Sequence, residues 1–526
     1  MPHVRRRVLV SVDVAPGAAQ LLTTHALDLH PGADGVLEGQ FPHSGDATAR
    51  LRASIAPSGA GSTIELEATS SLHVPYFGGV VRVITGRAMG SGLRDASRRI
   101  RAAAADEPPP APPRRLPFLP PVPFSPEQAS RLAAIALVGA LANFSGSLLT
   151  QNGDAVTDSF HRTDEALGFA LALSRIGVLF ALVASALADR VGRRRLILGG
   201  LATAAIANGV AAIAPSFEVF TASQVITRAA LQCTAVIASV AAIEDAPEGA
   251  RAYALSLFAL ALGLGFALSV ALLPLADLGE NGWRIAFAVS AATLIALPSL
   301  GRNLHETSRY RALTRRTRTR GRISEVFDRR YGGRFVLLGL VAFLTNVFAA
   351  PSSQLANRYL TGTHDFSNSQ VALFRGITAG VPGVVGILVA GRLAESRGRR
   401  PVAVIGLLVA TLFQVVFFVG DGALLWVAPT IAIVAAACVG VAVGTVNGEL
   451  FPTEVRGTSN GFLLVCGVAG AALGLLLATQ LKDVLGGLGP GIAVCGIAPL
   501  VAAVVLLPRL PETRARRLDE VSPSEI

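Results

Sequence analysis

The chain has 526 residues, of which 52% are hydrophobic and only 15% are charged. A soluble chain of this length would have roughly a quarter charged residues, so the composition argues against a water-soluble enzyme. The net charge of +11 is typical of nucleic-acid binders, but such proteins are not this apolar. The remaining basic class is a polytopic membrane protein whose cytoplasmic loops hold the arginines.

Residues 1–105 are predicted to form a small α+β domain. Apolar and polar residues alternate with the period of a β-strand at 8–14, 35–41, 49–55 and 63–72. Residues 80–105 then predict one amphipathic helix that is rich in arginine.

The end of this domain resembles a START-like helix-grip domain of the polyketide-cyclase type. The residues that resemble it are the strand exit His73-Val74-Pro75 and the arginine-rich helix after it. The resemblance implies a lipid-binding or regulatory module, and a vestigial scaffold is the alternative.

A linker is predicted at residues 106–128. Ten prolines lie between Ala105 and Pro126. A stretch of this kind is extended and semi-rigid and forms no core of its own, so it separates the first domain from the apolar remainder.

From residue 131 to residue 510 the chain consists of apolar runs of about 20 residues, the length at which an α-helix crosses a bilayer. We predict twelve such helices, at 131–150, 167–188, 196–214, 218–241, 252–275, 283–300, 335–356, 371–392, 402–420, 423–446, 458–480 and 488–508. They form an N-terminal six-helix half (129–300) and a C-terminal half (335–510), with an arginine-rich connector (301–334) between them and a tail (511–526) after them. The predicted fold is an all-α membrane protein, preceded by the small α+β domain.

The loops between the predicted spans differ in charge. The loops after spans 2 and 8 and the connector are rich in arginine. The opposite loops are acidic or nearly uncharged, with Asp154, Asp158, Asp164 and Glu165 after span 1, Asp277 and Glu280 after span 5, and Asp421 after span 9. By the positive-inside rule the arginine side is cytoplasmic, and twelve spans place both termini there. We therefore predict a multi-pass protein of the inner cell membrane with a cytoplasmic N-terminal domain.

Motifs that recur at a nearly constant shift indicate an internal repeat. Asp189-Arg-Val-Gly-Arg-Arg194 after span 2 matches Glu395-Ser-Arg-Gly-Arg-Arg400 after span 8, at a shift of 206 residues. The segment from Glu244 to Arg251 matches the segment from Glu449 to Arg456 at a shift of 205, and a weaker match after spans 6 and 12 has a shift of 206. Two six-helix halves are therefore repeated in the same orientation.

These motifs resemble those of the major facilitator superfamily, whose architecture is such a parallel repeat. The Asp-Arg-x-Gly-Arg-Arg loop and the Glu-x-x-Pro-x-x-x-Arg element are similar to those of its sugar-porter and metabolite-symporter branch. The resemblance covers about residues 130–515 and implies a secondary transporter that moves a small molecule by alternating access.

The resemblance also implies that charged pairs in these loops clamp the two halves on the inside and break when the transporter opens inward. A purely topological role for some of the charges is the alternative. The implied gating residues are Asp189, Arg190, Gly192, Arg193, Arg194, Glu244, Arg251, Glu395, Gly398, Arg399, Arg400, Glu449 and Arg456.

Polar side chains inside the spans predict the substrate site, because an ionisable residue within a span is costly and is retained for function. In the resembling family, helices 1, 4, 7 and 10 line the central cavity. The substrate-binding candidates are Asn143, Arg175, Arg228, Gln232, Asn346 and Asn447. Arg175, like Arg375 in span 8, could instead extend to the outer interface. An arginine-lined cavity with few carboxylates predicts an anionic substrate, such as a carboxylate-bearing metabolite.

Three features of relatives are absent from this chain. Span 7 lacks the Gln-Gln pair of sugar porters, so a hexose is not expected. Span 5 lacks the Gly-Pro motif of drug–proton antiporters, which favours uptake over efflux. Span 1 has Asn143-Phe-Ser145 where many proton-coupled relatives have an aspartate, so protons are only a candidate coupling ion. The alternatives left open are an efflux antiporter of the same superfamily and a transporter-like membrane sensor with a ligand-binding N-terminal domain.

No enzymatic centre, cofactor or metal is expected. The four cysteines lie singly in apolar runs without the spacing of a zinc site or a disulfide framework; they are Cys233, Cys438, Cys466 and Cys495. A membrane-embedded enzyme would need clustered histidines, cysteines or carboxylates within the spans. The expected partners are the small-molecule substrate and the lipid bilayer, and nucleic acid is excluded.

Overall fold

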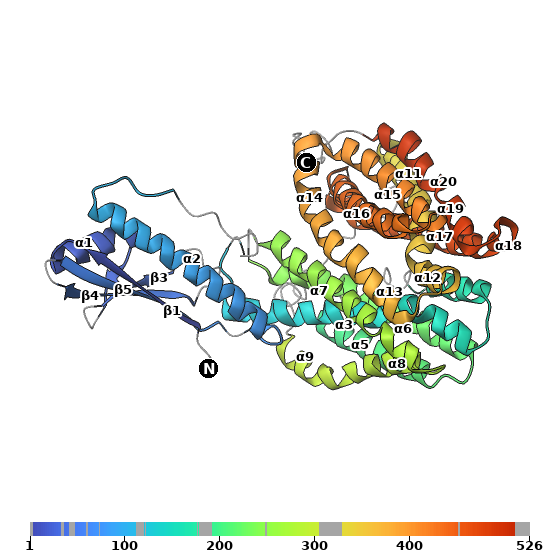
Figure 1. The fold of residues 1–526 in the computed structure, drawn as a ribbon, viewed down its shortest axis with the longest axis horizontal. Coiled ribbons are helices and arrows are strands. Elements are labelled where there is room, and N and C mark those ends of the chain that lie inside the picture. Colours follow the sequence, from blue (N-terminus) through green and yellow to red (C-terminus); the bar gives the residue numbers. More distant parts are fainter. Residues whose placement is uncertain are drawn as a thin grey trace. The chain divides into compact units, whose positions relative to one another are not determined.

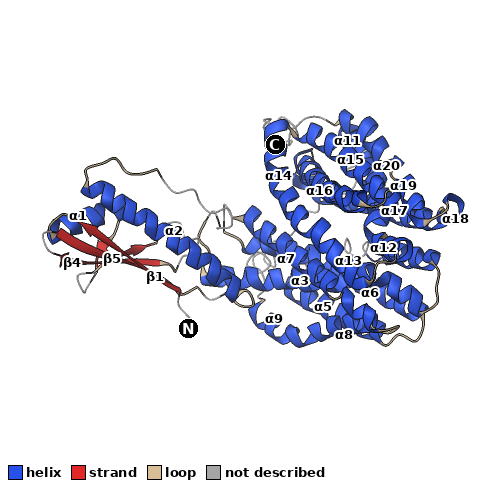
Figure 2. Cartoon of the chain, in the orientation of Figure 1, coloured by secondary structure: helices blue, strands red, loops and turns tan. Residues whose placement is uncertain are grey.

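The computed structural model (Figures 1 and 2) describes residues 4–32, 36–41, 48–58, 61–72, 74–111, 120, 122–175, 177, 192–247, 250–304, 329–450 and 453–510. It describes the backbone alone at 252, 329–332, 334, 384, 388, 391–392, 394–396, 444–450 and 453–460. The chain divides into two compact units. The first comprises Met1–Val138, Ala238–Ala261 and Ser299–Arg311, and the second comprises Gly139–Ile237, Leu262–Pro298 and Ala312–Ile526.

The N-terminal part of the first unit is a five-stranded antiparallel sheet with two helices. The strands are β1 (Val4–Val12), β2 (His30–Pro31), β3 (Leu37–Gln40), β4 (Arg50–Ser58) and β5 (Gly61–Ser70), in the spatial order β1-β5-β4-β3-β2. Helix α1 (Pro16–Leu27) follows the first strand, and α2 (Gly78–Ala104) follows the last. Figure 2 shows this sheet in red. The predicted small α+β domain is confirmed.

The alternating sequence of β5 explains how the sheet packs. Ile64 and Leu66 are buried in the core with Met89 and Leu93 of α2. Glu67, on the opposite face, pairs with arginines of β1, so β1 begins at Val4 and not at the predicted residue 8. His73, on which the START resemblance partly depends, lies outside the described residues.

The N-terminal half of the bundle follows the linker. Its helices are α3 (Pro126–Ser159), a helical segment at 164–175, α5 (Arg193–Ala212), α6 (Phe217–Asp245), α7 (Arg251–Ala271), α8 (Trp283–Ala291) and α9 (Leu297–Asn303). Helices are expected here because an apolar bilayer offers no partner for backbone N–H and C=O groups, which must then bond within the segment.

The C-terminal half is coloured yellow to red in Figure 1. Its helices are α11 (Arg329–Gln354), α12 (Ala356–His364), α13 (Asn368–Arg375), α14 (Val381–Arg397), α15 (Arg399–Val419), α16 (Ala423–Leu450), α17 (Thr453–Gln480), α18 (Lys482–Leu485), α19 (Leu488–Cys495) and α20 (Ile497–Val501). A π-helical turn joins α13 to α14, so that the eighth predicted span is one continuous helical path.

Among the described residues, eleven helices are long and apolar enough to cross a membrane, and each overlaps a predicted span. The predicted second span, 167–188, begins in the helical segment at 164–175 and lies largely outside the described residues. The helix of the first span, α3, ends at Ser159 and not at the predicted residue 150, because Gln151 and Asp158 beyond that point bond to residues of the C-terminal half.

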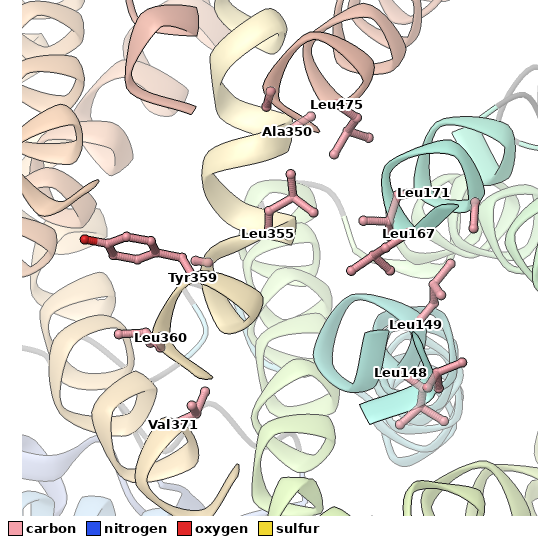
Figure 3. Close-up of a cluster of buried hydrophobic side chains, with 14 of the residues drawn as sticks. Leu148, Leu149, Leu167, Leu171, Ala350, Leu355, Tyr359, Leu360, Val371 and Leu475 are labelled. Atoms are coloured by element: carbon pink, nitrogen blue, oxygen red, sulfur yellow. The ribbon is translucent and has the colours of Figure 1, made fainter. Parts of the chain in front are cut away.

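The two ends of the bundle are distinguished by charge. We call the end that holds Asp158, Asp164 and Asp277 the acidic end, and the end that holds Gly192–Arg195 and Gly398–Arg400 the arginine end. An apolar cluster near the acidic end joins the two halves (Figure 3). Leu148, Leu149, Leu167 and Leu171 come from the N-terminal half, and Leu355, Leu360 and Leu475 come from the C-terminal half.

Candidate functional site

Arg228 of α6 lines a small polar cavity inside the N-terminal half. The cavity has a volume of about 10 Å³, room for about one water molecule. Its other lining residues are Gly146, Leu149, Thr150, Ser174, Gln224 and Thr227. Arg228 Nη1 donates a hydrogen bond of 2.7 Å to the Gly146 carbonyl oxygen, whereas Arg228 Nε is buried without a hydrogen-bond partner in the described part of the chain. The Arg228 guanidinium is thus held in place by one hydrogen bond, while its Nε–H donor has no acceptor among the described residues.

Arg175, in the helical segment at 164–175, is close enough to Arg228 for the two guanidinium groups to repel each other. With the Gln354 amide turned so that its oxygen accepts, Arg175 Nε donates to it at 3.1 Å. Gln354 lies at the end of α11, so Arg175 also contacts the other half. No carboxylate pairs with Arg175 or Arg228 among the described residues.

A network of buried polar side chains surrounds Asn208 of α5, which is fully buried. Gln224 Nε2 donates to Asn208 Oδ1 at 3.1 Å, and Thr227 Oγ1 donates to the same oxygen at 3.3 Å. Asn208 Nδ2 donates to Ser290 Oγ at 2.8 Å, and Ser290 Oγ donates to Ser145 Oγ at 2.8 Å. The network links four helices and orients Gln224 and Thr227 at the cavity beside Arg228.

Three of the remaining substrate candidates, Asn143, Gln232 and Asn346, do not line this cavity. Asn143 Nδ2 donates at 2.8 Å to the Leu262 carbonyl oxygen of α7, which is a contact between helices. Gln232 is half-buried one turn beyond Arg228 on α6. Asn346 Nδ2 donates to the Ala342 carbonyl oxygen of its own helix at 2.9 Å. Asn447 is on α16, and its side chain is not among those described.

Five charged residues at the acidic end connect the two halves; we call them the acidic-end ion cluster. Asp158 and Asp164 of the N-terminal half accept hydrogen bonds from Arg358 of α12, from Nη1 and Nε respectively, both at 2.7 Å. Lys482 of α18 lies 2.9 Å from Asp164 Oδ2 and 3.2 Å from Glu165 Oε1. Charge-assisted bonds of this length are the strong ones, and each joins one half to the other.

The acidic-end ion cluster perturbs the pKa values of Asp164, Glu165, Arg358 and Lys482. Burial alone would raise the pKa of Asp164, but hydrogen bonds from Lys482 and Arg358 hold it below its ordinary value. Burial alone would likewise lower the pKa of Arg358 and of Lys482, and Asp164 instead raises both. Mainly through a hydrogen bond from Thr163, the pKa of Glu165 is also lowered. All these groups are therefore ionised at neutral pH.

Asp277, in the turn after α7, caps a helix of the opposite half. Its Oδ1 accepts from the backbone N–H of Asn368 at 3.0 Å, and its Oδ2 accepts from the backbone N–H of Ser369 at 2.9 Å. These two groups begin α13, whose N-terminus favours a negative charge. The side chains of Asn368 and Ser369 donate to the same carboxylate at 2.9 and 2.6 Å. This contact is a second link between the halves at the acidic end.

A third link lies deeper in the bundle. Asn357 Nδ2 of α12 donates to the Gln151 backbone oxygen at 2.9 Å and to Gln151 Oε1 at 3.0 Å. Arg375 Nε and Nη2 donate to Asn357 Oδ1 at 3.0 and 2.8 Å, so this arginine bonds inside the bundle instead of extending to the interface. Close packing accompanies these bonds, since a Cβ atom added at Gly168 would lie 2.6 Å from Thr479 Oγ1 of α17.

At the arginine end the two halves share one backbone feature. Gly192 has φ 99° and begins α5, and Gly398 has φ 98° and begins α15. Only glycine adopts this conformation without strain, and the two positions are separated by the repeat shift. At this glycine the motif that predicted the repeat thus has the same backbone conformation in both halves.

The other predicted gating residues are described in part. Arg193 is buried, and Arg194 and Arg251 are exposed; Glu244 is half-buried near the end of α6. Arg400 Nη1 donates weakly, at 3.5 Å, to the Leu510 carbonyl oxygen, and Arg399 precedes it in α15. Asp189 and Arg190 lie outside the described residues, as do the side chains of Glu395, Glu449 and Arg456. The clamp that these residues would form stays a prediction.

The sequence did not predict Asn208, Gln224, Arg358 or Lys482. Asn208 and Gln224 are polar residues within apolar runs, and that signal was available in the sequence. Arg358 and Lys482 gave no signal, because their partners lie about 200 and 300 residues away in the chain. No group of three or more metal-ligating side chains occurs in the part of the chain that the structure describes.

The chain matches the family model of the Major Facilitator Superfamily over residues 134–381 and 335–523. A probable 4-methylmuconolactone transporter of Cupriavidus pinatubonensis is 24% identical over 388 residues, which are 68% of this chain and 87% of the relative.

Two solved structures have a similar fold. A bacterial homologue of the human lysosomal transporter Spinster, inward-facing and occupied, has a TM-score of 0.61 at 18% identity, over 74% of this chain and 98% of that one. The xylose transporter XylE of E. coli, inward-open, has a TM-score of 0.61 at 16% identity, over the same shares of the two chains.

Proposed function

Because the chain belongs to the Major Facilitator Superfamily and is a membrane transporter, we propose that it carries a small organic anion into the cell by alternating access. The observation that supports an anion is the pair of guanidinium groups, Arg175 and Arg228, inside the N-terminal half. Both lie within apolar spans, and neither is paired with a carboxylate in the described residues. An uncompensated charge inside a span is costly, so a substrate carboxylate is the natural counter-charge.

The polar groups at the cavity have the donors that a carboxylate needs, and the cavity, which holds about one water molecule in this state, would have to widen to admit the substrate. Arg228 Nε has no partner, and a guanidinium binds a carboxylate with two parallel hydrogen bonds. Gln224 and Thr227 stand beside it, fixed by Asn208, and can bond a second oxygen of the substrate. The relative from Cupriavidus is named for a lactone, which supports a small oxygen-rich metabolite as the class of substrate.

The contacts at the acidic end support an inward-facing state. Three sets of hydrogen bonds link the halves there, centred on Arg358, Asp277 and Asn357. If the positive-inside rule holds, the acidic end faces outward and the arginine end faces the cytoplasm. The substrate would then enter from outside when these links break and leave on the arginine side when they form.

Counterflow in proteoliposomes tests this proposal. Vesicles that contain the purified chain are loaded with an unlabelled compound and placed in a trace of the same compound carrying a radiolabel, for a panel of organic acids, neutral sugars and amines. We expect transient accumulation for organic acids only. Counterflow of sugars or amines without acids would contradict the anionic substrate, and no counterflow for any compound would favour a membrane sensor.

A further inference from the structure

One face of α3 forms a contact with α12 that we call the seam. Gln151, Asp154 and Asp158 recur at intervals of three and four residues, so they lie on the same face of α3. The first and last of them bond to neighbouring residues of α12, Asn357 and Arg358. Asp154 therefore lies between two contacts that join the halves (Figure 1 labels both helices).

Asp154 differs from the other carboxylates of the acidic end in its burial. It is 4% exposed, whereas the side chain of Asp158 is 60% exposed. Its Oδ1 atom is buried and has no hydrogen-bond partner among the described residues. The carboxyl group interacts with the Thr361 side chain and lies in the field of Arg358. A carboxylate in this position is enclosed by protein with one oxygen unbonded.

The nearby cations are already engaged by other carboxylates. Arg358 bonds to Asp158 and Asp164, and Lys482 bonds to Asp164 and Glu165. The titratable and charged groups around the seam are Asp158 at this end of α3, Asp164 and Glu165 before the second span, Arg358, Tyr359 and His364 on α12, Arg375 on α13, and Lys482 and Asp483 on α18. Asp154 is the buried carboxyl group in this set that no cation bonds directly among the described residues.

We propose that closure of the acidic end binds one proton at Asp154, so that the seam itself is a proton-binding site. Enclosing an ionised carboxylate with an unbonded oxygen is costly, whereas the neutral acid is not penalised in this way. Closure therefore favours the neutral acid, and by reciprocity a proton on Asp154 favours closure. The site lies about three turns beyond Asn143-Phe-Ser145, where the sequence lacks an aspartate.

This inference rests on the proposed alternating access and adds a ligand, the proton, to its outer closure. A single linked proton changes the ratio of closed to open molecules by up to about tenfold per pH unit. The effect is confined to the pH range in which Asp154 titrates in one state but not in the other. The pH dependence of closure can be measured without knowing the substrate.

Electron paramagnetic resonance on the full chain in nanodiscs tests the proposal. Spin labels are placed at His161→Cys and Val484→Cys, two exposed positions on opposite halves beside the acidic end, with the native cysteines changed to serine. The fraction with a short label distance is measured from pH 8 to pH 5. We expect this fraction to rise as the pH falls, and to be high and independent of pH in Asp154→Asn.

Asp158→Asn is the matched control, since it removes an exposed carboxylate from the same helix face. It should lower the closed fraction at every pH and keep the pH dependence. Asp154→Glu should keep the dependence with a shifted midpoint, which guards against a folding defect in the amide variant. The proposal is overturned if Asp154→Asn responds to pH as the parent does, or if the parent does not respond. Counterflow of the same variants, reconstituted in proteoliposomes, separates this result from failure of the proposed transport.

Discussion

The two halves repeat each other at the arginine end and differ in the interior. Gly192 and Gly398 have the same backbone conformation, 206 residues apart. At the same shift, Arg228 corresponds to Val434, and Ser290 corresponds to Gly496. The polar network around Asn208 thus lacks these two members in the C-terminal half. The difference teaches that the loops are duplicated whereas the candidate recognition site is not.

The acidic end shows the same asymmetry in charge. The N-terminal half supplies Asp158, Asp164 and Asp277, and the C-terminal half supplies Arg358 and Lys482. The two halves are related by the repeat, but at the acidic end they carry opposite charges. Their facing surfaces are therefore complementary. Substitutions in one half at a time test this difference between the halves.

Arg228→Gln should remove the anion site. Truncating a group that pairs with a buried charge costs about 2–5 kcal/mol, so we expect uptake of an organic acid, measured as kcat/KM, to fall by about 30-fold or more. Arg284→Gln is the matched control in the same half, because Arg284 Nη1 donates to the carbonyl oxygens of Ala212 and Ala214, at 3.0 Å each. That variant should be less stable but keep its substrate. Equal losses in both variants would contradict the assignment of the site.

Arg358→Gln should open the acidic end. It removes two ion pairs whose partners are partly exposed, and such pairs contribute up to about 1 kcal/mol each, so the closed-to-open ratio should fall by up to about 30-fold. The measurement is the rate at which a maleimide labels a cysteine placed at Asn152, which is fully buried in this state. Arg358→Lys keeps the charge without the fork geometry and should restore part of the closure. Unchanged labelling in Arg358→Gln would mean that the ion cluster does not hold the halves together.

Gly192→Ala and Gly398→Ala should destabilise the chain to similar extents. Any other residue is strained at a φ near 100°, by about 1–3 kcal/mol. Thermal unfolding of the purified chain in detergent measures the loss for each variant separately. A large effect at one glycine and none at the other would show that the two loops are equivalent in sequence but not in energy.

The acidic-end ion cluster should be insensitive to pH near neutrality. The pKa of Asp164 is depressed from 3.8, so its contribution is fully present above about that pH and is lost as the pH falls through the depressed value. The pKa of Lys482 is raised from 10.5, so its contribution is lost only as the pH rises above that value. In an Asp154→Asn background, the closed fraction should therefore be constant between about pH 5 and pH 9. If the closed fraction of this variant instead changed with a midpoint near pH 6 or 7, a group other than Asp154 and the acidic-end ion cluster would control closure.

The sequence predicted most of the fold, since hydropathy alone locates the eleven membrane-spanning runs found in the part of the chain that the structure describes. It misjudged the end of α3, because Gln151, Asp154 and Asp158 read as the start of a loop when their partners on α12 are unknown. It also made Arg228 a candidate for the substrate site, from its place inside an apolar run, and that stays a prediction. It did not identify Arg358 or Lys482, because a charge in a loop looks the same whether water or another half of the protein surrounds it.

The most direct test of the account is competition between an acid and its neutral analogue for a single site. Counterflow of a radiolabelled organic acid is measured with an excess of the unlabelled acid or of the corresponding primary amide, in the parent chain and in Arg228→Gln. We predict that the acid competes and the amide does not in the parent, and that the variant shows no counterflow of the acid. Equal competition by acid and amide, with unchanged transport in the variant, would contradict an anion site at Arg228.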